Sequence, residues 1–290
     1  MKFLIYGNGW IGNMISSHLK MKNLYSLGNI EVSFGKERAD NYELIYKEIS
    51  SCNPDRIICA LGRTSGNGVN NIDYLEQPGK LHENLRDNLH APLNIAEVCF
   101  QLNIHLTYIG TGCIFDSEST PDYKFTETDK PNFFGSQYSV VKGITDQLIT
   151  KYNCANIRIR MPISSKHHDR NFITKLIKYT NIIDKQNSVT YLPEFLPIII
   201  DLSYNKFCGT INCVNTGSIS PLEIVQRYKE LIDKDHTYNQ TTEKQLLEHN
   251  IIVSKRSNNT LSTNLIEKLY SVSNIRYIID SILLSLGKIN

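Results

Sequence analysis

The sequence lacks the features that identify membrane-spanning, secreted and nucleic-acid-binding proteins. No run of eighteen apolar residues occurs in its 290 residues, which argues against a transmembrane helix. The apolar segment after Met1 and Lys2 has no small-residue site of the kind at which signal peptides are cleaved. The formal net charge is only +2, and no basic stripe interleaved with aromatic residues occurs, so nucleic acid is not an expected partner. We therefore expect a cytoplasmic protein, without a membrane partner, that binds a small molecule.

Paired cysteines and a recognisable set of metal ligands are also missing. The seven cysteines are an odd number without a CxxC pair: Cys52, Cys59, Cys99, Cys113, Cys154, Cys208 and Cys213. Such spacing argues against a disulfide framework or a structural zinc site and predicts thiols. We interpret the neighbouring His167 and His168 as a polar loop, because adjacent residues rarely face one ion and no third ligand is evident. No metal is expected.

Apolar runs alternate with helical patterns along the first half of the chain. Strands are predicted at residues 2–6, 30–34, 56–61, 106–109 and 157–161, and helices at 11–20, 42–51, 81–102 and 138–152. This alternation indicates an α/β fold, a doubly wound parallel sheet of the Rossmann type. We expect a Rossmann domain in residues 1–160, its sheet completed by residues 209–215, and a smaller C-terminal α/β substrate lobe in residues 161–290. Helices are predicted in that lobe at residues 172–179 and 221–232.

A glycine-rich turn lies between the first predicted strand and the first predicted helix. It consists of Gly7, Asn8, Gly9, Trp10, Ile11 and Gly12, the GxGxxG pattern. Glycines at these positions permit a tight turn and let backbone N–H groups approach a pyrophosphate, so the turn predicts dinucleotide binding. Folds specific for NAD usually carry an acidic residue after the second strand. This chain has Lys36 and Arg38 there, which suit the 2′-phosphate of NADP(H), although two solvated surface charges are the alternative interpretation.

A tyrosine and a lysine have the spacing of a proton-transfer pair. Tyr138 and Lys142 form a YxxxK pattern, which on a helix places both side chains on one face, a turn apart. An ammonium beside a phenol lowers the phenol pKa from about 10, so that the tyrosine can exchange a proton with a carbonyl near neutral pH. Thr111 ends a predicted strand at the carboxyl edge of the sheet, where it can hydrogen-bond a substrate carbonyl.

Further cofactor contacts are expected from Ala60, Gly62 and Asn88, together with Tyr138 and Lys142. Asn88 precedes the strand that ends at Thr111 and is a candidate polar support behind the site. An exposed helical asparagine is the alternative interpretation for this residue.

Taken together, these residues resemble the extended short-chain dehydrogenase/reductases. Within them they are similar to the nucleotide-rhamnose synthases, which are bifunctional 3,5-epimerase/4-reductases, and to dTDP-4-dehydrorhamnose reductase. The resemblance covers nearly the whole chain, and its most specific stretches are residues 111–115, 130–136, 158–165, 170–175 and 256–259. It implies NADPH as cofactor and a UDP- or dTDP-linked 4-keto-6-deoxy-glucose as substrate, which becomes the L-rhamnose nucleotide. A homodimer through the two long helices, and a separate 4,6-dehydratase that supplies the substrate, are implied as well.

The same resemblance implies an epimerase pair, which maps onto Cys113 and Lys175. Removing a proton beside a carbonyl and returning it to the opposite face requires two acid/base groups, and a thiolate and a lysine of lowered pKa suit that task. Asn171 and Arg256 are the expected substrate-binding residues, with Arg256 suited to a diphosphate. The loop at residues 63–71 departs from the family pattern through its glycines and asparagines.

Three alternatives remain open. A sugar-nucleotide 4,6-dehydratase would carry acidic residues after Thr111, where this chain has Gly112 and Cys113. A 4-reductase without epimerase activity is the second alternative, and a non-catalytic NADP-binding regulatory subunit is the third. The presence of Thr111, Tyr138 and Lys142 argues against the regulatory subunit.

Overall fold

The computed structural model describes residues 1–25 and 29–289 of the chain. Two units can be distinguished within it. Unit 1 comprises Met1–Thr111, Gln137–Arg158 and Leu196–Ile211, and unit 2 comprises Gly112–Ser136, Ile159–Phe195 and Asn212–Asn290. The chain therefore passes between the units repeatedly.

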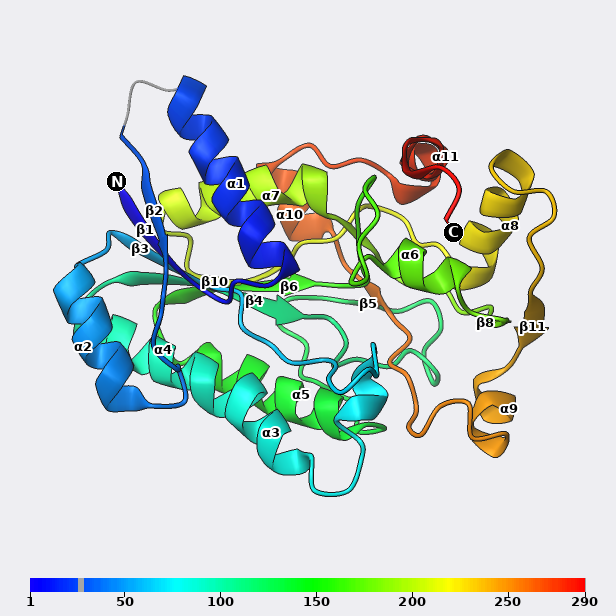
Figure 1. The fold of residues 1–290 in the computed structure, drawn as a ribbon, viewed down its shortest axis with the longest axis horizontal. Coiled ribbons are helices and arrows are strands. Elements are labelled where there is room, and N and C mark those ends of the chain that lie inside the picture. The colour runs from blue at the N-terminus through cyan, green and yellow to red at the C-terminus, as the bar shows by residue number, and fades with distance from the viewer. Residues whose placement is uncertain (26–28, 290) are drawn as a thin grey trace. The chain divides into compact units, whose positions relative to one another are not determined.

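Unit 1 is built on a six-stranded sheet with the order β10-β6-β4-β3-β1-β2 (Figure 1). The strands are β1 (Lys2–Tyr6), β2 (Glu31–Phe34), β3 (Arg56–Cys59), β4 (His105–Thr111), β6 (Cys154–Ile159) and β10 (Gly209–Asn212). β2, β1, β3 and β4 pair in parallel, as the doubly wound fold predicts. The direction in which strands are added reverses between β1 and β3, and such a switch point is where open α/β sheets bind ligands.

Helices cover both faces of this sheet. Figure 1 shows α2 (Tyr42–Cys52), α4 (Ala91–Gln101) and α5 (Gln137–Ile149) on one face, and α1 (Trp10–Tyr25) and α7 (Leu192–Tyr204) on the other. The helix predicted at 81–102 consists of α3 (Leu81–Leu85), the π-helical turn η2 (Arg86–His90) and α4. The short helix η1 (Ile72–Tyr74) precedes them.

The core of unit 1 follows from the apolar periodicity of these segments. Ile45 and Ile49 of α2 and Ile95 and Val98 of α4 are fully buried beside the strands. Asn41 caps the N-terminus of α2 by accepting a hydrogen bond from Leu44 N–H. α7 was not predicted, because its near-continuous apolar run and internal Pro197 hide a helical period.

Unit 2 consists of shorter elements. Its helices are α6 (Phe172–Ile177), α8 (Pro221–Leu231), α9 (Glu243–Glu248), α10 (Asn264–Leu269) and α11 (Ile275–Leu286). Its strands form two-stranded pairs: β5 (Lys124–Phe125) with β12 (Thr260–Leu261), β7 (Pro162–Ile163) with β9 (Thr190–Tyr191), and β8 (Asn181–Ile183) with β11 (Asn239–Thr241). α6, α8 and α11 pack around one apolar cluster, and a capping box of Ser220 and Glu223 begins α8.

Two predicted strands end earlier than expected. The strand predicted at 56–61 stops at Cys59. The strand predicted at 157–161 stops at Ile159, and Met161 adopts a left-handed backbone conformation with φ of 38°. This conformation is strained for a residue with a side chain and ends the extended run before Pro162. Across residues 1–25 and 29–289, no helix is long and apolar enough to cross a membrane.

Candidate active site

The glycine turn of unit 1 has the geometry of a dinucleotide-binding loop. Gly7 has φ of 102°, and a Cβ atom on it would lie 2.7 Å from the carbonyl oxygen of Ala60. A Cβ on Gly12 would lie 1.9 Å from the carbonyl oxygen of Gly7, whereas a Cβ on Gly9 would have no neighbour within 4 Å. Sterics therefore require the first and third glycines for the turn itself, while the middle glycine faces open space at the start of α1. A pyrophosphate would approach the backbone there.

Lys36 and Arg38 follow β2 beside this turn. Because Ile5 of β1 pairs with Phe34 of β2, the ends of the two strands are neighbours. Arg38 is exposed and pairs with Asp40 at 2.9 Å, and the backbone N–H of Lys36 donates to Glu48 Oε1 at 2.6 Å. The positions suit a 2′-phosphate, and Arg38 would have to exchange Asp40 for it.

Asn88 lies in the π-helical turn η2 and is completely buried, which rules out the exposed alternative. Its Oδ1 accepts from Arg63 N–H at 2.9 Å, and its Nδ2 donates to Arg63 O and to Asn84 Oδ1, each at 2.9 Å. Its own carbonyl oxygen accepts from Thr145 of α5 at 2.7 Å. Asn88 therefore joins the loop after β3 to α5, and a π turn is a frequent feature of functional sites.

The predicted proton-transfer pair lies on the buried face of α5. Tyr138 and Lys142 are 7% and 4% exposed, and Thr111 ends β4 at 9% exposure. The ammonium of Lys142 donates to the hydroxyl of Tyr108 of β4 and lies 4.8 Å from the centre of its ring. Burial raises the pKa of Tyr108 well above its usual value, so Tyr108 stays a neutral acceptor for this ammonium.

Sequence reasoning missed the carboxylate that caps α5. The backbone N–H groups of Gln137 and Tyr138 donate to the two oxygens of Glu76, at 2.9 and 3.1 Å. A carboxylate is favourable at a helix N-terminus because it meets unsatisfied N–H groups and the positive end of the dipole. Glu76 lies 62 positions before Tyr138, so no local motif could have indicated it.

Unit 2 holds Cys113 against an arginine. Arg160 is completely buried, and its Nη1 lies 3.3 Å from Cys113 Sγ. The same nitrogen donates to the carbonyl oxygen of Gly112 at 3.3 Å and to Ser257 Oγ at 3.2 Å. Arg160 and Ser257 both lie in stretches that carry the family resemblance, but no local pattern indicates that they meet at Cys113.

Lys175 lies in α6, and Asn171 directly precedes this helix. Burial, reinforced by Arg170 and opposed by Asp169, lowers the pKa of Lys175 to about 8. Asn171 is fully buried as the N-cap of α6, and its Nδ2 donates to the carbonyl oxygens of Ser164 and Lys166. Both amide hydrogens of Asn171 are therefore engaged, so its geometry supports α6 and does not favour the expected direct contact with substrate.

Arg256 is partly buried and donates from Nη1 to the carbonyl oxygen and hydroxyl of Ser254, at 3.0 and 2.9 Å. No group of three His, Cys, Asp or Glu side chains suited to a metal occurs in the described part of the chain, and His167 and His168 are exposed in a loop.

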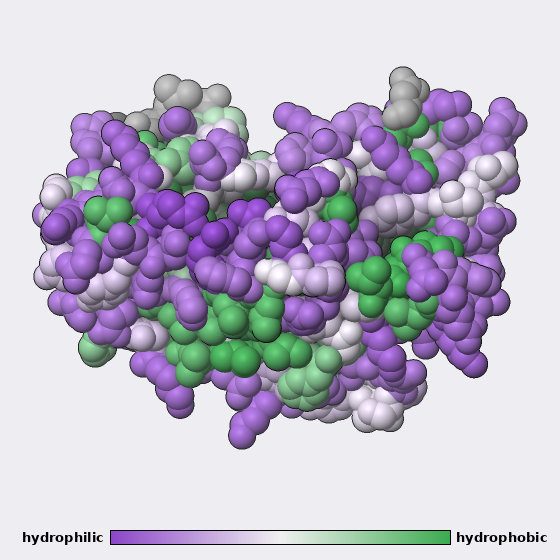
Figure 2. All heavy atoms as spheres, turned by 60° about the horizontal axis from the view of Figure 1, so that its bottom comes forward, coloured by the Kyte–Doolittle hydropathy of each residue, from purple (hydrophilic) through white to green (hydrophobic). Residues whose placement is uncertain are grey.

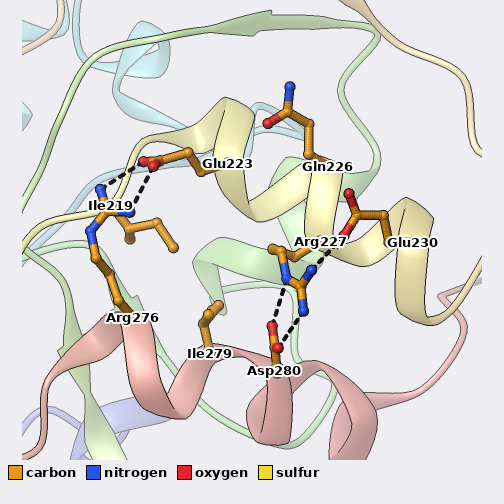
Figure 3. Close-up of a pocket in the computed structure, with 8 residues that line it drawn as sticks. All are labelled: Ile219, Glu223, Gln226, Arg227, Glu230, Arg276, Ile279 and Asp280. Carbon is orange, nitrogen blue, oxygen red and sulfur yellow. Dashed lines mark hydrogen bonds and ion pairs between the residues drawn. The ribbon is translucent and has the colours of Figure 1, made fainter.

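A hollow of about 410 Å³ lies between α8 and α11 of unit 2 (Figure 3). Arg227 pairs there with Asp280 and Glu230, and Arg276 pairs with Glu223 at 2.8 Å. Both guanidinium groups already have carboxylate partners, and none of the residues predicted from the sequence lines the hollow. We therefore do not consider it a part of the active site.

Known proteins similar to this chain include rhamnose-forming enzymes. The mimivirus protein L780 is 45% identical over 277 residues, covering 93% of each chain, and the crystal structure of the L780 UDP-rhamnose synthase from Acanthamoeba polyphaga mimivirus has a TM-score of 0.92. That structure covers 99% of each chain at 43% identity. The bifunctional dTDP-4-dehydrorhamnose 3,5-epimerase/dTDP-4-dehydrorhamnose reductase of Arabidopsis thaliana is 36% identical, over 89% of this chain and 84% of its own.

A trifunctional UDP-glucose 4,6-dehydratase/3,5-epimerase/reductase of the same plant is also 36% identical, but this chain spans only 39% of its length. A family model described as the RmlD substrate binding domain matches residues 1–191. This match covers more than half of the sequence, and the chain therefore belongs to the RmlD substrate-binding-domain family.

Proposed function

We propose that this chain is an NADPH-dependent oxidoreductase that reduces the 4-keto group of a nucleotide-linked 4-keto-6-deoxy sugar in rhamnose synthesis. The observation that carries the proposal is the buried Tyr138–Lys142 pair on α5. The same unit contains the glycine turn, in which a Cβ atom on Gly9 would have no neighbour within 4 Å. The similarity to the L780 UDP-rhamnose synthase supports the substrate class. We propose UDP as the nucleotide for the same reason.

Reduction requires a hydride at C4 and a proton on its oxygen. NADPH supplies the hydride when bound, with the pyrophosphate at residues 7–12 and the 2′-phosphate at Lys36 and Arg38. The hydroxyl groups of Thr111 and Tyr138 polarise the C4 carbonyl, and Tyr138 delivers the proton. The ammonium of Lys142 stabilises the phenolate that remains, since an adjacent positive charge favours the charged form of an acid.

Epimerisation at C3 and C5 is the second activity that we propose for this chain. In the thiolate form, Cys113 removes a proton from a carbon next to the C4 carbonyl, which leaves an enolate and a thiol. The ammonium of Lys175 donates a proton to the opposite face of that carbon and becomes an amine. Its lowered pKa suits an acid that must release a proton near neutral pH. We assign Arg256 to the substrate diphosphate.

Exchange at C3 and C5 is expected to slow as the pH rises through about 8, the pKa of Lys175. The pKa is lowered from 10.5, so the ammonium form is lost about 2.5 units earlier than in an ordinary lysine. Above pH 8 the rate should fall about tenfold per unit. Deuterium exchange into the 4-keto sugar nucleotide, followed by NMR without NADPH, measures it. A rate that rises above pH 8 would instead make the amine of Lys175 a base.

Self-association is proposed through the two long helices of unit 1. Phe100 of α4 and Ile144 and Leu148 of α5 are 62%, 41% and 41% exposed. Figure 2 shows hydrophobic side chains gathered on the face that carries these helices. Since matching apolar patches bury each other in symmetric dimers, we expect the chain to be a homodimer.

A double variant in which both Ile144 and Leu148 are replaced by lysine is expected to be a monomer. Light scattering during gel filtration measures the oligomeric state. The matched control is Leu231→Lys, an exposed leucine of α8 in unit 2. A wild-type chain that is monomeric, or a double variant that remains dimeric, contradicts the interface.

The proposed function is tested by incubating the protein with NADPH and UDP-4-keto-6-deoxy-glucose in D₂O. We expect NADPH oxidation together with an L-rhamnose nucleotide that carries deuterium at C3 and C5. The substrate is prepared by a 4,6-dehydratase, the reaction class that must precede this one. Oxidation that yields an undeuterated, unepimerised sugar would leave only the 4-reductase, and no oxidation with either the UDP or the dTDP substrate would favour the regulatory subunit.

A further inference from the structure

The guanidinium of Arg160 is buried without a carboxylate partner. In the part of the chain that the structure describes, its acceptors are the carbonyl oxygens of Gly112 and Ser257, the hydroxyl of Ser257, the amide oxygen of Asn187 and the thiol of Cys113. Its Nε is buried and has no acceptor at all. Transferring a charge from water to the protein interior is unfavourable unless an opposite charge lies close by. Among these acceptors, only the thiol can carry a negative charge.

Arg158, two positions earlier on the same chain segment, shows the usual arrangement. It is also buried, but Asp146 receives two of its hydrogen bonds, from Nε at 2.8 Å and from Nη2 at 2.7 Å. The chain thus places a carboxylate beside one buried guanidinium and a thiol beside the other. Burial lowers the pKa of Arg160, and Cys113 and then Asp116 oppose that shift.

We propose that Arg160 is a positioning residue that holds Cys113 as a thiolate for proton removal from the sugar. This inference rests on the proposed epimerase function. The guanidinium lies 3.3 Å from the sulfur, where it stabilises the negative charge of Cys113 when this residue acts as the base. When Cys113 takes a proton from the carbon beside the C4 carbonyl, the negative charge moves to the enolate and a neutral thiol remains next to Arg160.

The surroundings hold the guanidinium in place. Asn187 Oδ1 accepts from Arg160 Nη2 and also from the backbone N–H of Asn259, and Ser257 O accepts from Nη2 at 2.6 Å. Asn187, Arg160 and Asn259 are completely buried. These contacts come from two separate stretches of unit 2, so the charge is fixed beside Cys113 before any ligand binds.

The test measures the thiolate by its ultraviolet absorption at neutral pH, as the difference between the wild-type chain and Cys113→Ser. Deuterium exchange at C3 and C5 of the 4-keto sugar nucleotide is the second readout. Arg160→Met should lower both signals about tenfold or more, since an adjacent opposite charge shifts an ionisation by one to three pH units. Arg227→Met, which removes an arginine paired with carboxylates in α8, is the matched control and should leave the thiolate signal unchanged.

Asn187→Asp decides the outcome where Arg160→Met fails to fold. It gives the guanidinium a carboxylate of its own at nearly constant shape, so that the thiolate should lose its counterion. Because aspartate loses the two hydrogen bonds that Asn187 Nδ2 donates to Lys185 O and Asn258 Oδ1, the thermal midpoint should fall while cooperative unfolding is kept. If Arg160 has only a structural role, the Asn187→Asp variant should keep the wild-type thiolate signal. That result would overturn the inference. Identical thiolate absorption of the wild-type chain and Cys113→Ser would also overturn it. Undiminished deuterium exchange in Cys113→Ser would instead refute the proposed epimerase function.

Discussion

Tyr138→Phe is expected to lower NADPH-dependent reduction of the 4-keto sugar by a factor of about 10²–10⁴, the range in which a positioned acid contributes. The phenyl ring keeps the buried side chain of α5 but cannot donate a proton to the C4 oxygen. Deuterium exchange at C3 and C5 should fall much less than reduction, because Cys113 and Lys175 are unchanged and Thr111 still polarises the C4 carbonyl. Loss of NADPH absorbance in a single turnover, with NMR of the remaining ketone, measures the two activities separately.

Tyr152→Phe is the matched control for this replacement. Tyr152 follows α5 and hydrogen-bonds Glu97 of α4 at 3.0 Å, which is unrelated to the proposed chemistry. It should reduce the ketone at the wild-type rate. Reduction by Tyr138→Phe at a rate similar to that of the wild-type chain would exclude Tyr138 as the proton donor.

Cys113→Ser is expected to abolish epimerisation, with deuterium exchange at C3 and C5 lowered by a factor of about 10²–10⁴. Serine has nearly the same shape, but its hydroxyl is not ionised near neutral pH, so the base is lost. The buffered assay in D₂O without NADPH isolates this step from reduction. Net formation of the L-rhamnose nucleotide should cease even though Tyr138 and Lys142 are intact.

Cys208→Ser serves as the control, because Cys208 is exposed and does not belong to the proposed site. Its exchange rate should equal that of the wild-type chain. If Cys113→Ser still forms the L-rhamnose nucleotide at the wild-type rate, Cys113 is not the base and the epimerase assignment fails.

Local sequence patterns determined the parts of the site whose geometry is set within a few residues. The glycine turn could be predicted because Gly7 and Gly12 are required by clashes with backbone atoms close in sequence or on the adjoining strand end. The YxxxK pair could be predicted because helical periodicity alone places Tyr138 and Lys142 on one face. The doubly wound fold followed in the same way, from periods of two and 3.6 residues.

Local patterns misjudged elements whose conformation depends on their neighbours. The helix at 81–102 reads as one periodic segment, yet a π turn interrupts it where Asn88 binds Arg63 and Asn84. The strand at 157–161 stops early, where Arg160 turns into the interior and Met161 takes a positive φ. In both places long-range contacts override the local preference.

Local patterns in the amino-acid sequence predict the fold class and the residue types proposed for proton transfer at Thr111, Tyr138 and Cys113. Folding sets which residues lie beside them: Glu76 at the first turn of α5, and Arg160 beside Cys113, 47 positions away in the chain. The physical reason is that hydrogen bonds and charge pairs act through space at a few ångströms, and no periodicity along the chain records which distant residue folding brings within that range.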